Sequence, residues 1–290
     1  MKPHDLAFAL LINALWGFQF VAAKVAVEAF PPIFVTGIRF LLVFALLFPF
    51  LRMPHGQWAR VLGITIFAGA LHFALMFTGI KLAGDVASVA IVTQMGVPFA
   101  TLLAVLFLHE HIHWRRTMGI VAAFAGVAIM GFDPRVFGYI EAILLLMVAA
   151  FLMAVGQVLM RGLKGVGVFN LQAWIALVSA PSLLALSWLI EADHANAIAS
   201  AELLPWGAIV YSAVGASVIG HGGVYYLLNR YPVSLVSPTM LLSPVFGVAS
   251  GVLVMGDVLT ERMLVGGLFV LGGALVITLR QPYAPVVQVE

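Results

Sequence analysis

Long apolar runs follow one another along the whole chain, and each is close to the length of a membrane span. A helix needs about 20 mostly apolar residues to cross the hydrocarbon core of a bilayer. The gaps between the runs are short and contain turn-forming residues, such as Pro31-Pro32 and Asp133-Pro134. The pattern predicts ten transmembrane helices, at residues 5–27, 32–51, 60–81, 85–107, 115–132, 138–160, 168–190, 205–228, 232–255 and 262–279.

The fourth and ninth of these windows resemble each other. A shift of 146 residues places Thr93 on Thr239 and Pro98 on Pro244. After one inserted residue the match continues, with Glu110 on Asp257, Gly119 on Gly266 and Gly126 on Gly273. Each half then holds five spans, and an odd number makes the second half enter the membrane upside down. We predict two inverted five-helix repeats, residues 1–136 and residues 137–290, the second ending in a short disordered C-terminal tail.

The composition excludes a soluble domain. Hydrophobic residues make up 63% of the chain and charged residues only 9%, whereas soluble domains are about half apolar and a quarter charged. The lipid bilayer is therefore the predicted partner for most of the surface. There is no cysteine, and the formal net charge is only +2. These values exclude disulfides and thiol chemistry and give no reason to expect a nucleic-acid partner.

The distribution of lysine and arginine predicts the orientation. Cytoplasmic loops carry an excess of these residues. If the N-terminus is cytoplasmic, nine of them lie inside, namely Lys2, Arg52, Arg60, Arg115, Arg116, Arg161, Lys164, Arg230 and Arg280. Four lie outside, namely Lys24, Lys81, Arg135 and Arg262. An even number of spans returns the chain to the same side, so both termini are predicted to be cytoplasmic.

Polar residues at membrane depth gather in six of the ten windows. Such groups cost free energy unless they are paired, hydrated or turned toward protein. We predict that spans 1, 3, 4, 6, 8 and 9 line a cavity, whereas spans 5 and 10, apolar and rich in glycine, serve as scaffold or dimer-contact helices. The candidate substrate-binding or cavity residues are Trp16, Gln19, His72, Ser88, Thr93, Gln94, Gln157, His221, Tyr225, Ser237, Thr239 and Ser243.

Four further residues are candidates for hinges or gates. Pro98 and Pro244 each remove a backbone N–H and free a carbonyl one turn earlier, which opens a pocket, supplies a hinge or makes an ordinary kink. Lys24 and Arg161 occupy corresponding places near the ends of spans 1 and 6. They either gate the path or bind a carboxylate, or they only extend to the membrane surface and anchor the helix ends.

The two histidines at membrane depth have two interpretations. His72 and His221 either bind substrate or carry protons, or they form hydrogen bonds with neighbouring carbonyl groups. No aspartate or glutamate lies at membrane depth beside them, which argues against a carboxylate proton relay. It also favours a substrate with a carboxylate over a bare cation.

A short loop after the fourth window carries alternating histidines. His109, His111 and His113 surround Glu110, but this spacing is a weak signal for a metal. We predict no metal site and no cofactor. Glu110 and its counterpart Asp257 are expected to pair with a nearby arginine or to cap the following helix.

A longer pattern gives a resemblance that covers nearly the whole chain. It consists of Trp16-Gly17-x-x-Phe20-Val21-x-x-Lys24, Pro31-Pro32, Arg39-Phe40, Ala87-Ser88, Pro98, Glu110, Gly119 and Gly126, with Pro244, Gly266 and Gly273 in the second half. In these residues the chain resembles the EamA branch of the drug/metabolite transporter superfamily. The resemblance implies export of amino acids or related small metabolites from the cytoplasm across the bacterial inner membrane, without ATP.

Several functions remain open at this point. The leading hypothesis is a secondary transporter that works by alternating access as a uniporter, with a small-molecule substrate and a monomeric or homodimeric assembly. A proton-coupled antiporter of drugs or metabolites, using His72 or His221, is the alternative. A non-transporting membrane scaffold would lack a continuous polar cavity. A membrane-embedded enzyme would need a cluster of acidic, histidine or cysteine residues at one membrane face, and we predict that the protein is not an enzyme.

Overall fold

The fold is built from helices alone in the part of the chain that the structure describes. The computed structural model describes residues 1–108 and 113–279, apart from the side chains of Val233 and Ser234. Its elements are α1 (Pro3–Ala29), α2 (Pro32–Leu47), η1 (Phe48–Phe50), α3 (Trp58–Ile64), η2 (Thr65–Leu71), α4 (His72–Leu82), α5 (Val86–Val92), η3 (Thr93–Met95), α6 (Gly96–Leu108), α7 (Trp114–Gly131), α8 (Pro134–Phe137), α9 (Ile140–Met160), α10 (Val168–Ile190), α11 (His194–Ser200), α12 (Leu203–Tyr211), η4 (Ser212–Gly220), α13 (His221–Leu228), α14 (Val233–Val236), η5 (Ser237–Leu241), α15 (Leu242–Ser250), η6 (Gly251–Met255) and α16 (Glu261–Leu279). The predictions for His109, Glu110, His111 and the C-terminal tail lie outside the described residues.

Each of the ten predicted windows coincides with a helix or an unbroken run of helical segments. Among the described residues, nine of these runs are long and apolar enough to cross a membrane. The tenth is α7, which is less apolar because its first turn contains Arg115 and Arg116. The prediction of an all-helical, multi-pass membrane protein is confirmed. The count of ten spans and the cytoplasmic position of the termini stay predictions.

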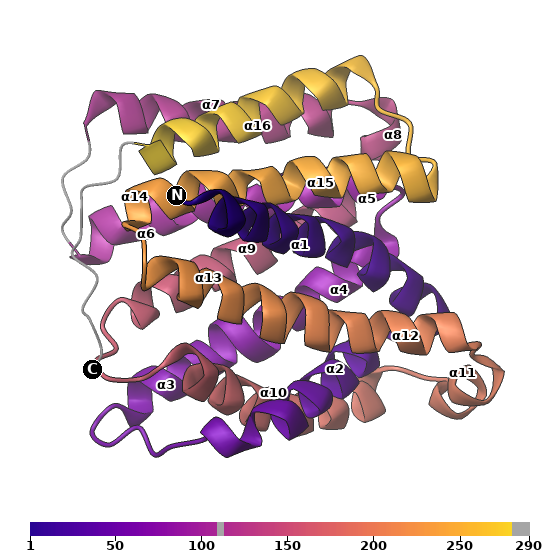
Figure 1. The fold of residues 1–290 in the computed structure, drawn as a ribbon. Coiled ribbons are helices and arrows are strands. Elements are labelled where there is room, and N and C mark those ends of the chain that lie inside the picture. Colours follow the sequence, from indigo (N-terminus) through magenta and orange to yellow (C-terminus); the bar gives the residue numbers. More distant parts are fainter. Residues whose placement is uncertain (109–112, 280–290) are drawn as a thin grey trace.

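The connections between the long helices alternate between two ends of the bundle, so α1 begins and α16 stops at the same end (Figure 1). We call this the basic end, because its charged residues among those described are Lys2, Asp5, Arg52, Arg60, Arg115, Arg116, Arg161, Lys164 and Arg230. We call the opposite end the acidic end, because it carries Lys24, Glu28, Lys81, Asp85, Asp133, Arg135, Glu141, Glu191, Asp193, Glu202, Asp257, Glu261 and Arg262. The two ends therefore differ in the sign of their charge.

The helices α7 and α16 lie against each other along one edge of the bundle (Figure 1). Their glycines face one another: a Cβ added at Gly119 would lie 2.8 Å from the carbonyl oxygen of Gly273, and one at Gly126 would lie 2.5 Å from that of Gly266. Small residues allow helix backbones to approach closely in a membrane, where packing rather than water drives association. The glycines of the fifth and tenth windows are thus used for contact within the chain.

Two spans contain a π-helical segment at matching positions. The segment η2 begins at Thr65 and is followed by His72, and the segment η4 begins at Ser212 and is followed by His221. Their first residues are 147 apart, within one residue of the shift of 146 that aligns Thr93 with Thr239. A π-helical turn holds an extra residue and is frequent at functional sites. The same departure from α-helical geometry thus occurs at equivalent places in the sequence repeat.

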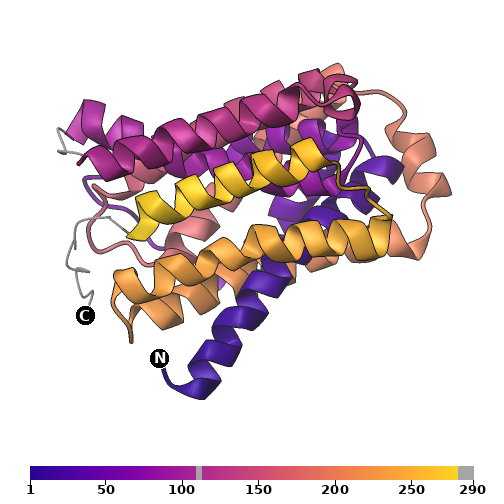
Figure 2. The same ribbon diagram turned by 90° about the horizontal axis from the view of Figure 1, so that it is seen from above.

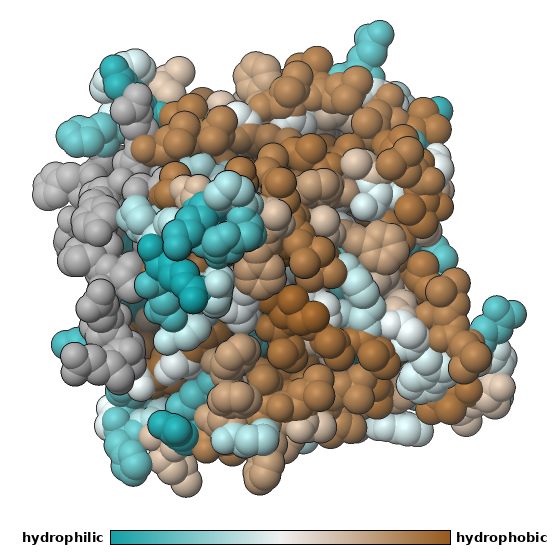
Figure 3. Space-filling view, viewed as in Figure 1, coloured by the Kyte–Doolittle hydropathy of each residue, from teal (hydrophilic) through white to brown (hydrophobic). Residues whose placement is uncertain are grey.

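The helix α1 connects the middle of the bundle with its front face. Seen from above, α1 (indigo) passes under α15 (orange) at a steep angle, and its N-terminal half projects from the bundle (Figure 2). The crossing is close because Gly17 lies against Phe246 and Gly247 of α15. The front face is mainly hydrophobic, and hydrophilic residues gather on it near the start of α1 (Figure 3).

Candidate functional site

Two adjoining cavities lie between first-half spans and α9, and one of them is also bordered by η5 and α16. One has a volume of about 250 Å³ and is lined by His72, Met76, Thr93, Gln94, Gly96, Val97, Leu146, Ala149, Ala150, Met153 and Gln157. The other has a volume of about 310 Å³ and is lined by Gln94, Val97, Ala100, Gln157, Val158, Arg161, Ser237, Met240, Leu241 and Thr278. We call the two together the central cavity, since they share Gln94, Val97 and Gln157.

The central cavity reaches from the basic end into the middle of the bundle. Its lining runs along α9 from Leu146 and ends at Arg161, the residue after this helix, which is about 22 Å at 1.5 Å per residue. Between Leu146 and the acidic end no described cavity continues along α9. The space is thus open toward one end, and its polar groups are distributed along its length.

His72 forms the polar part of the deep region. The ring is 7% exposed, and its Nδ1 lies 2.8 Å from the carbonyl oxygen of Ala149. A carbonyl oxygen only accepts, so Nδ1 donates, and in a neutral ring Nε2 is then left as an acceptor. This arrangement joins the two interpretations of His72, because one nitrogen bonds a neighbouring carbonyl while the residue still lines the cavity.

Two amides and one cation follow toward the basic end. Gln94 and Gln157 line both regions of the central cavity from opposite helices. Arg161 lies one residue beyond the end of α9 and lines the outer region. A cation at a helix C-terminus also interacts favourably with the helix dipole. The cavity therefore runs from a neutral acceptor, through two amides, to a positive charge.

The two prolines of the sequence repeat lie beside this cavity and are buried. Pro98 is in the first turn of α6, directly after the 3₁₀ segment η3, and Pro244 is in the first turn of α15, directly after η5. Proline lacks an N–H, so it leaves the carbonyl four residues earlier without its helical partner. Those earlier residues are Gln94 and Met240, and both line the outer region of the central cavity. The irregular backbone thus lies in the lining of the central cavity.

The acidic end is closed by a contact between distant parts of the chain. Asp257 Oδ2 accepts hydrogen bonds from the backbone N–H groups of Val86 and Ala87, each at 2.8 Å. It therefore caps the start of α5, and the expectation that it pairs with Arg262 or caps the following helix is wrong. Burial raises the pKa of Asp257, and Asp85 adds to this, whereas the two N–H groups and Lys24 oppose it.

Lys24 reinforces the same end. Its Nζ donates to the carbonyl oxygens of Ile80 and Lys81, each at 3.3 Å, and to that of Ala83 at 2.8 Å. These carbonyls are the unpaired groups at the end of α4, and a cation at that position stabilises them. Lys24 is a helix-end contact in this structure, and it lies at the opposite end from Arg161, its predicted counterpart.

Several predicted cavity residues instead hold α1 against η4. Trp16 Nε1 donates to the carbonyl oxygen of Ala216 at 2.9 Å, and Gln19 Nε2 donates to Ser212 Oγ at 2.9 Å. The buried Arg39 reaches η4 from α2, donating from Nη2 to Ser217 Oγ at 2.8 Å. Trp16 thus supplies a partner for a backbone carbonyl of the π-helical segment, and Gln19 and Arg39 bind its serine hydroxyls. Trp16 and Gln19 do not line the central cavity.

The remaining predicted residues have local roles or lie elsewhere. Ser88 is fully buried, with its hydroxyl 3.1 Å from that of Tyr139 and its N–H bonded to Asp85. His221 is exposed and lies 5.3 Å from Trp16, centroid to centroid. The Thr239 hydroxyl donates to the carbonyl oxygen of Val236. Ser243 is buried and Tyr225 is half-buried. None of these three residues lines the central cavity. Of the predicted residues, the structure brings together His72, Thr93, Gln94, Gln157, Arg161 and Ser237.

One cavity residue with a polar side chain was missed, along with the apolar part of the lining. Thr278 lines the outer region from α16, a helix predicted to be a scaffold. Its single hydroxyl near the end of an apolar helix is the only signal that the sequence offers. Spans 1 and 8, which were predicted to line the cavity, do not contribute to the lining described above.

The family of the protein follows from comparison with known sequences. The EamA-like transporter family matches the chain twice, over residues 6–132 and residues 140–279. The chain belongs to the EamA-like transporter family. This identification confirms the resemblance seen in the sequence, and it establishes a multi-pass protein of the bacterial inner membrane that transports metabolites.

Individual relatives agree with the family. A protein of Salmonella typhimurium, named a probable amino-acid metabolite efflux pump, is 30% identical over 283 residues, which cover 94% of both chains. A protein of Escherichia coli with the same name is 27% identical over 282 residues, again covering 94% of both. One solved crystal structure has a TM-score of 0.64 with 20% identity, over 96% of this chain and 98% of the other. It shows that the fold is shared.

Proposed function

We propose that this protein exports neutral amino acids or closely related metabolites across the bacterial inner membrane, through the central cavity. The observation that carries the proposal is the sequence of groups in that cavity: the His72 acceptor, the amides of Gln94 and Gln157, and the cation of Arg161. The names of the relatives from Salmonella typhimurium and Escherichia coli support the same substrate class.

A zwitterion matches the polarity of the cavity. The α-ammonium group of a substrate donates to His72 Nε2, and its carboxylate is directed toward the amides and Arg161. The walls near His72 are apolar, with Met76, Leu146 and Met153. Such walls favour a substrate with an apolar side chain, because polar groups left without partners in a closed site cost free energy.

The closed acidic end and the open basic end support alternating access. In this structure the path leads from the basic end to the middle of the bundle, and Asp257 and Lys24 fasten the far end. In the predicted orientation the basic end faces the cytoplasm, so the cavity is positioned to receive a substrate for export. Inverted repeats support the second state, in which the ends exchange roles.

Uniport, in which the substrate gradient alone drives transport, is the favoured mechanism. Among the described residues, no carboxylate lines the central cavity, so coupling to protons would have to use His72. The antiporter alternative therefore makes a distinct prediction: a pH gradient would stimulate transport, and His72→Gln would remove the stimulation. Uniport predicts the same initial rate with and without the gradient.

The function is tested by counterflow in liposomes that contain the purified full-length protein. We expect saturable exchange of at least one neutral amino acid from a panel of the twenty. Gln157→Ala should reduce it about tenfold, the value of roughly one hydrogen bond to a charged group. Gln172→Ala, an amide on α10 outside the central cavity, is the matched control and should leave the rate unchanged.

Two outcomes would contradict the proposal. If the folded protein exchanges no amino acid of the panel faster than empty liposomes do, the proposed substrate class is wrong. Equal loss of exchange in Gln157→Ala and Gln172→Ala would remove the central cavity as its site. Substrate analogues sharpen the result, because a methyl ester and an analogue without the amino group should each compete at least tenfold more weakly than the parent amino acid.

A further inference from the structure

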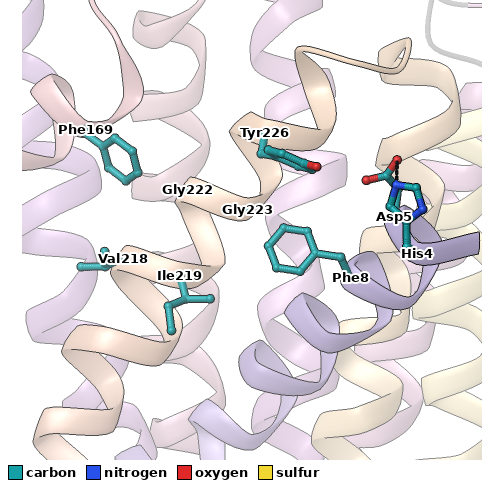
Figure 4. A pocket seen from close by; sticks show the side chains of 9 residues that line it. All are labelled: His4, Asp5, Phe8, Phe169, Val218, Ile219, Gly222, Gly223 and Tyr226. Carbon is teal, nitrogen blue, oxygen red and sulfur yellow. Dashed lines mark ion pairs between the residues drawn. The ribbon is translucent and has the colours of Figure 1, made fainter. Parts of the chain in front are cut away.

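A second cavity lies on the outside of the bundle, away from the central cavity. It has a volume of about 440 Å³ and is bordered by α1, the start of α10 and the junction of η4 with α13. We call it the front groove. Figure 4 shows Phe169 on one side of it, Phe8 on the other, and Gly222 and Gly223 on the helix between them.

The front groove is apolar along one part and polar at the other. Val218 and Ile219 form the apolar part away from the basic end. Tyr226, His4 and Asp5 lie toward the basic end, and Phe169 adds an apolar ring at the height of Tyr226 (Figure 4). From Ile219 to Tyr226 the groove follows α13 for about 10 Å, at 1.5 Å per residue. A ligand that fills it must be apolar over this length and polar beyond it.

Two basic side chains, Arg230 and Lys2, lie near the polar part of the groove. The Arg230 guanidinium lies 3.7 Å from the centroid of the Tyr226 ring, and the chain there also carries Lys2 and His4. The one carboxylate, Asp5, is 3% exposed and already has partners. It accepts from the Tyr231 hydroxyl at 2.7 Å and lies 3.3 Å from His4 Nε2. The charged groups near the groove that remain for a ligand are therefore the cations Arg230 and Lys2.

We propose that the front groove is a binding site for one anionic phospholipid. One acyl chain lies along Ile219, Gly222 and Phe8, and the headgroup phosphate contacts Arg230. The location agrees with this occupant, because the groove opens on the hydrophobic front face and its polar end coincides with the hydrophilic cluster near the start of α1 (Figure 3). Charge complementarity selects an anionic headgroup, and basic residues near such lipids contribute about 1 kcal/mol each, or roughly fivefold in affinity. This inference does not depend on the identity of the transported substrate.

Native mass spectrometry of the detergent-purified full-length protein tests the site. We expect the first molecule of dioleoyl phosphatidylglycerol to bind about fivefold more tightly than dioleoyl phosphatidylcholine. Arg230→Gln should remove that preference, whereas Arg135→Gln, an exposed arginine at the acidic end, should preserve it. Gly222→Leu should weaken the binding of both lipids, because a Cβ at that position would already lie 2.7 Å from Phe169 Cζ.

Three results would overturn the inference. Equal binding of the two lipids would remove the headgroup preference. Equal effects of Arg230→Gln and Arg135→Gln would show a general attraction to surface charge. Displacement of the lipid by glycerol 3-phosphate, which has the headgroup chemistry without an acyl chain, would show a free phosphate site, not a lipid groove. If Gly222→Leu fails to fold, the arginine pair and the glycerol 3-phosphate competition still decide.

Discussion

The two ends of this bundle are held in different ways. At the acidic end, carboxylates bind the free N–H groups at helix starts that are far away in sequence: Asp257 caps α5, and Glu191 accepts from Ile33 and Phe34 of α2 at 2.9 and 3.0 Å. Cations bind terminal carbonyls at both ends, as Lys24 does with Ala83 and Arg60 with Gly162, but at the basic end a cavity remains between the helices. The comparison indicates that the acidic end acts as a latch whose parts are a few identifiable hydrogen bonds.

The largest effect is expected from removal of the Asp257 carboxylate. Asp257→Ala leaves two N–H groups of α5 without partners, which should favour an opened acidic end by about 2 kcal/mol, or roughly thirtyfold. The natural chain contains no cysteine. A single cysteine at Met76, in the deep part of the central cavity, therefore reports opening through its rate of labelling by a membrane-impermeant maleimide from the acidic end.

The matched control is a buried carboxylate at the other end. Asp5→Ala removes a side chain that is bonded to Tyr231 and His4 at the basic end. It should leave labelling from the acidic end unchanged. If Asp5→Ala and Asp257→Ala accelerate labelling equally, the two ends are not mechanically distinct and the comparison is lost.

A smaller opening is expected from Lys24→Met. Methionine keeps the apolar stem but loses the donors to the three carbonyls at the end of α4. Labelling of the Met76→Cys reporter should rise about tenfold, since one charge-assisted contact at a helix end is worth about 1 kcal/mol or somewhat more. Lys81→Met, whose Nζ lies 3.5 Å from the carbonyl oxygen of Phe30, should change it much less. Unaltered labelling in Lys24→Met would show that Asp257 alone fastens this end.

The pH dependence of the latch has a definite sign. Because burial raises the pKa of Asp257 above its ordinary value of 3.8, the closed end binds a proton more tightly than an end with this carboxylate in water. The cost of burying the charge is fully present above the raised pKa and is lost as the pH falls through it. Because a maleimide reacts with the thiolate, labelling slows at acidic pH in every variant. It should slow more steeply with Asp257 present than in Asp257→Asn, and that difference reports the latch. A less steep slowing with Asp257 present would reverse the assignment.

The smallest effect is expected beside the latch, at Thr260. Its hydroxyl donates to Asp133 Oδ2 at 2.6 Å and is the main cause of the lowered pKa of Asp133. Thr260→Val should cost about 1 kcal/mol, which lowers the melting temperature by about 2–3 °C in a chain of this size. Ser182→Ala, which loses only a bond within its own exposed helix turn, should change it by less than 1 °C. Equal shifts would mean that the Thr260 bond contributes nothing specific.

The helices were predictable from the sequence, because the bilayer requires apolar runs of a fixed length and the chain contains little else. Gln94, Gln157 and His72 were also predictable as cavity residues, since polar groups at membrane depth need protein or water around them. The π-helical segments η2 and η4 were not predicted. A single extra residue in a turn leaves the apolar pattern of a span unchanged.

Contacts between distant segments explain the other differences. Asp257 caps a helix 171 residues away, so no local pattern identifies its partner. Trp16 and Gln19 carry the same polar signal as Gln94, but they face carbonyl and hydroxyl groups of η4. The sequence indicates which side chains need a partner, and only the packing of helices decides whether that partner is a solute or the protein itself.

The glycine contacts between α7 and α16 have a mechanical consequence. The backbones touch at Gly119 and Gly126, which leaves no room between the two helices for a larger side chain. Because α7 comes from the first half of the chain and α16 from the second, we expect the two halves to rotate relative to each other about this contact. A rotation that opens one end of the bundle and closes the other would occur about this contact. A bulky residue at Gly126 should therefore slow transport, although Gly126 does not line the central cavity.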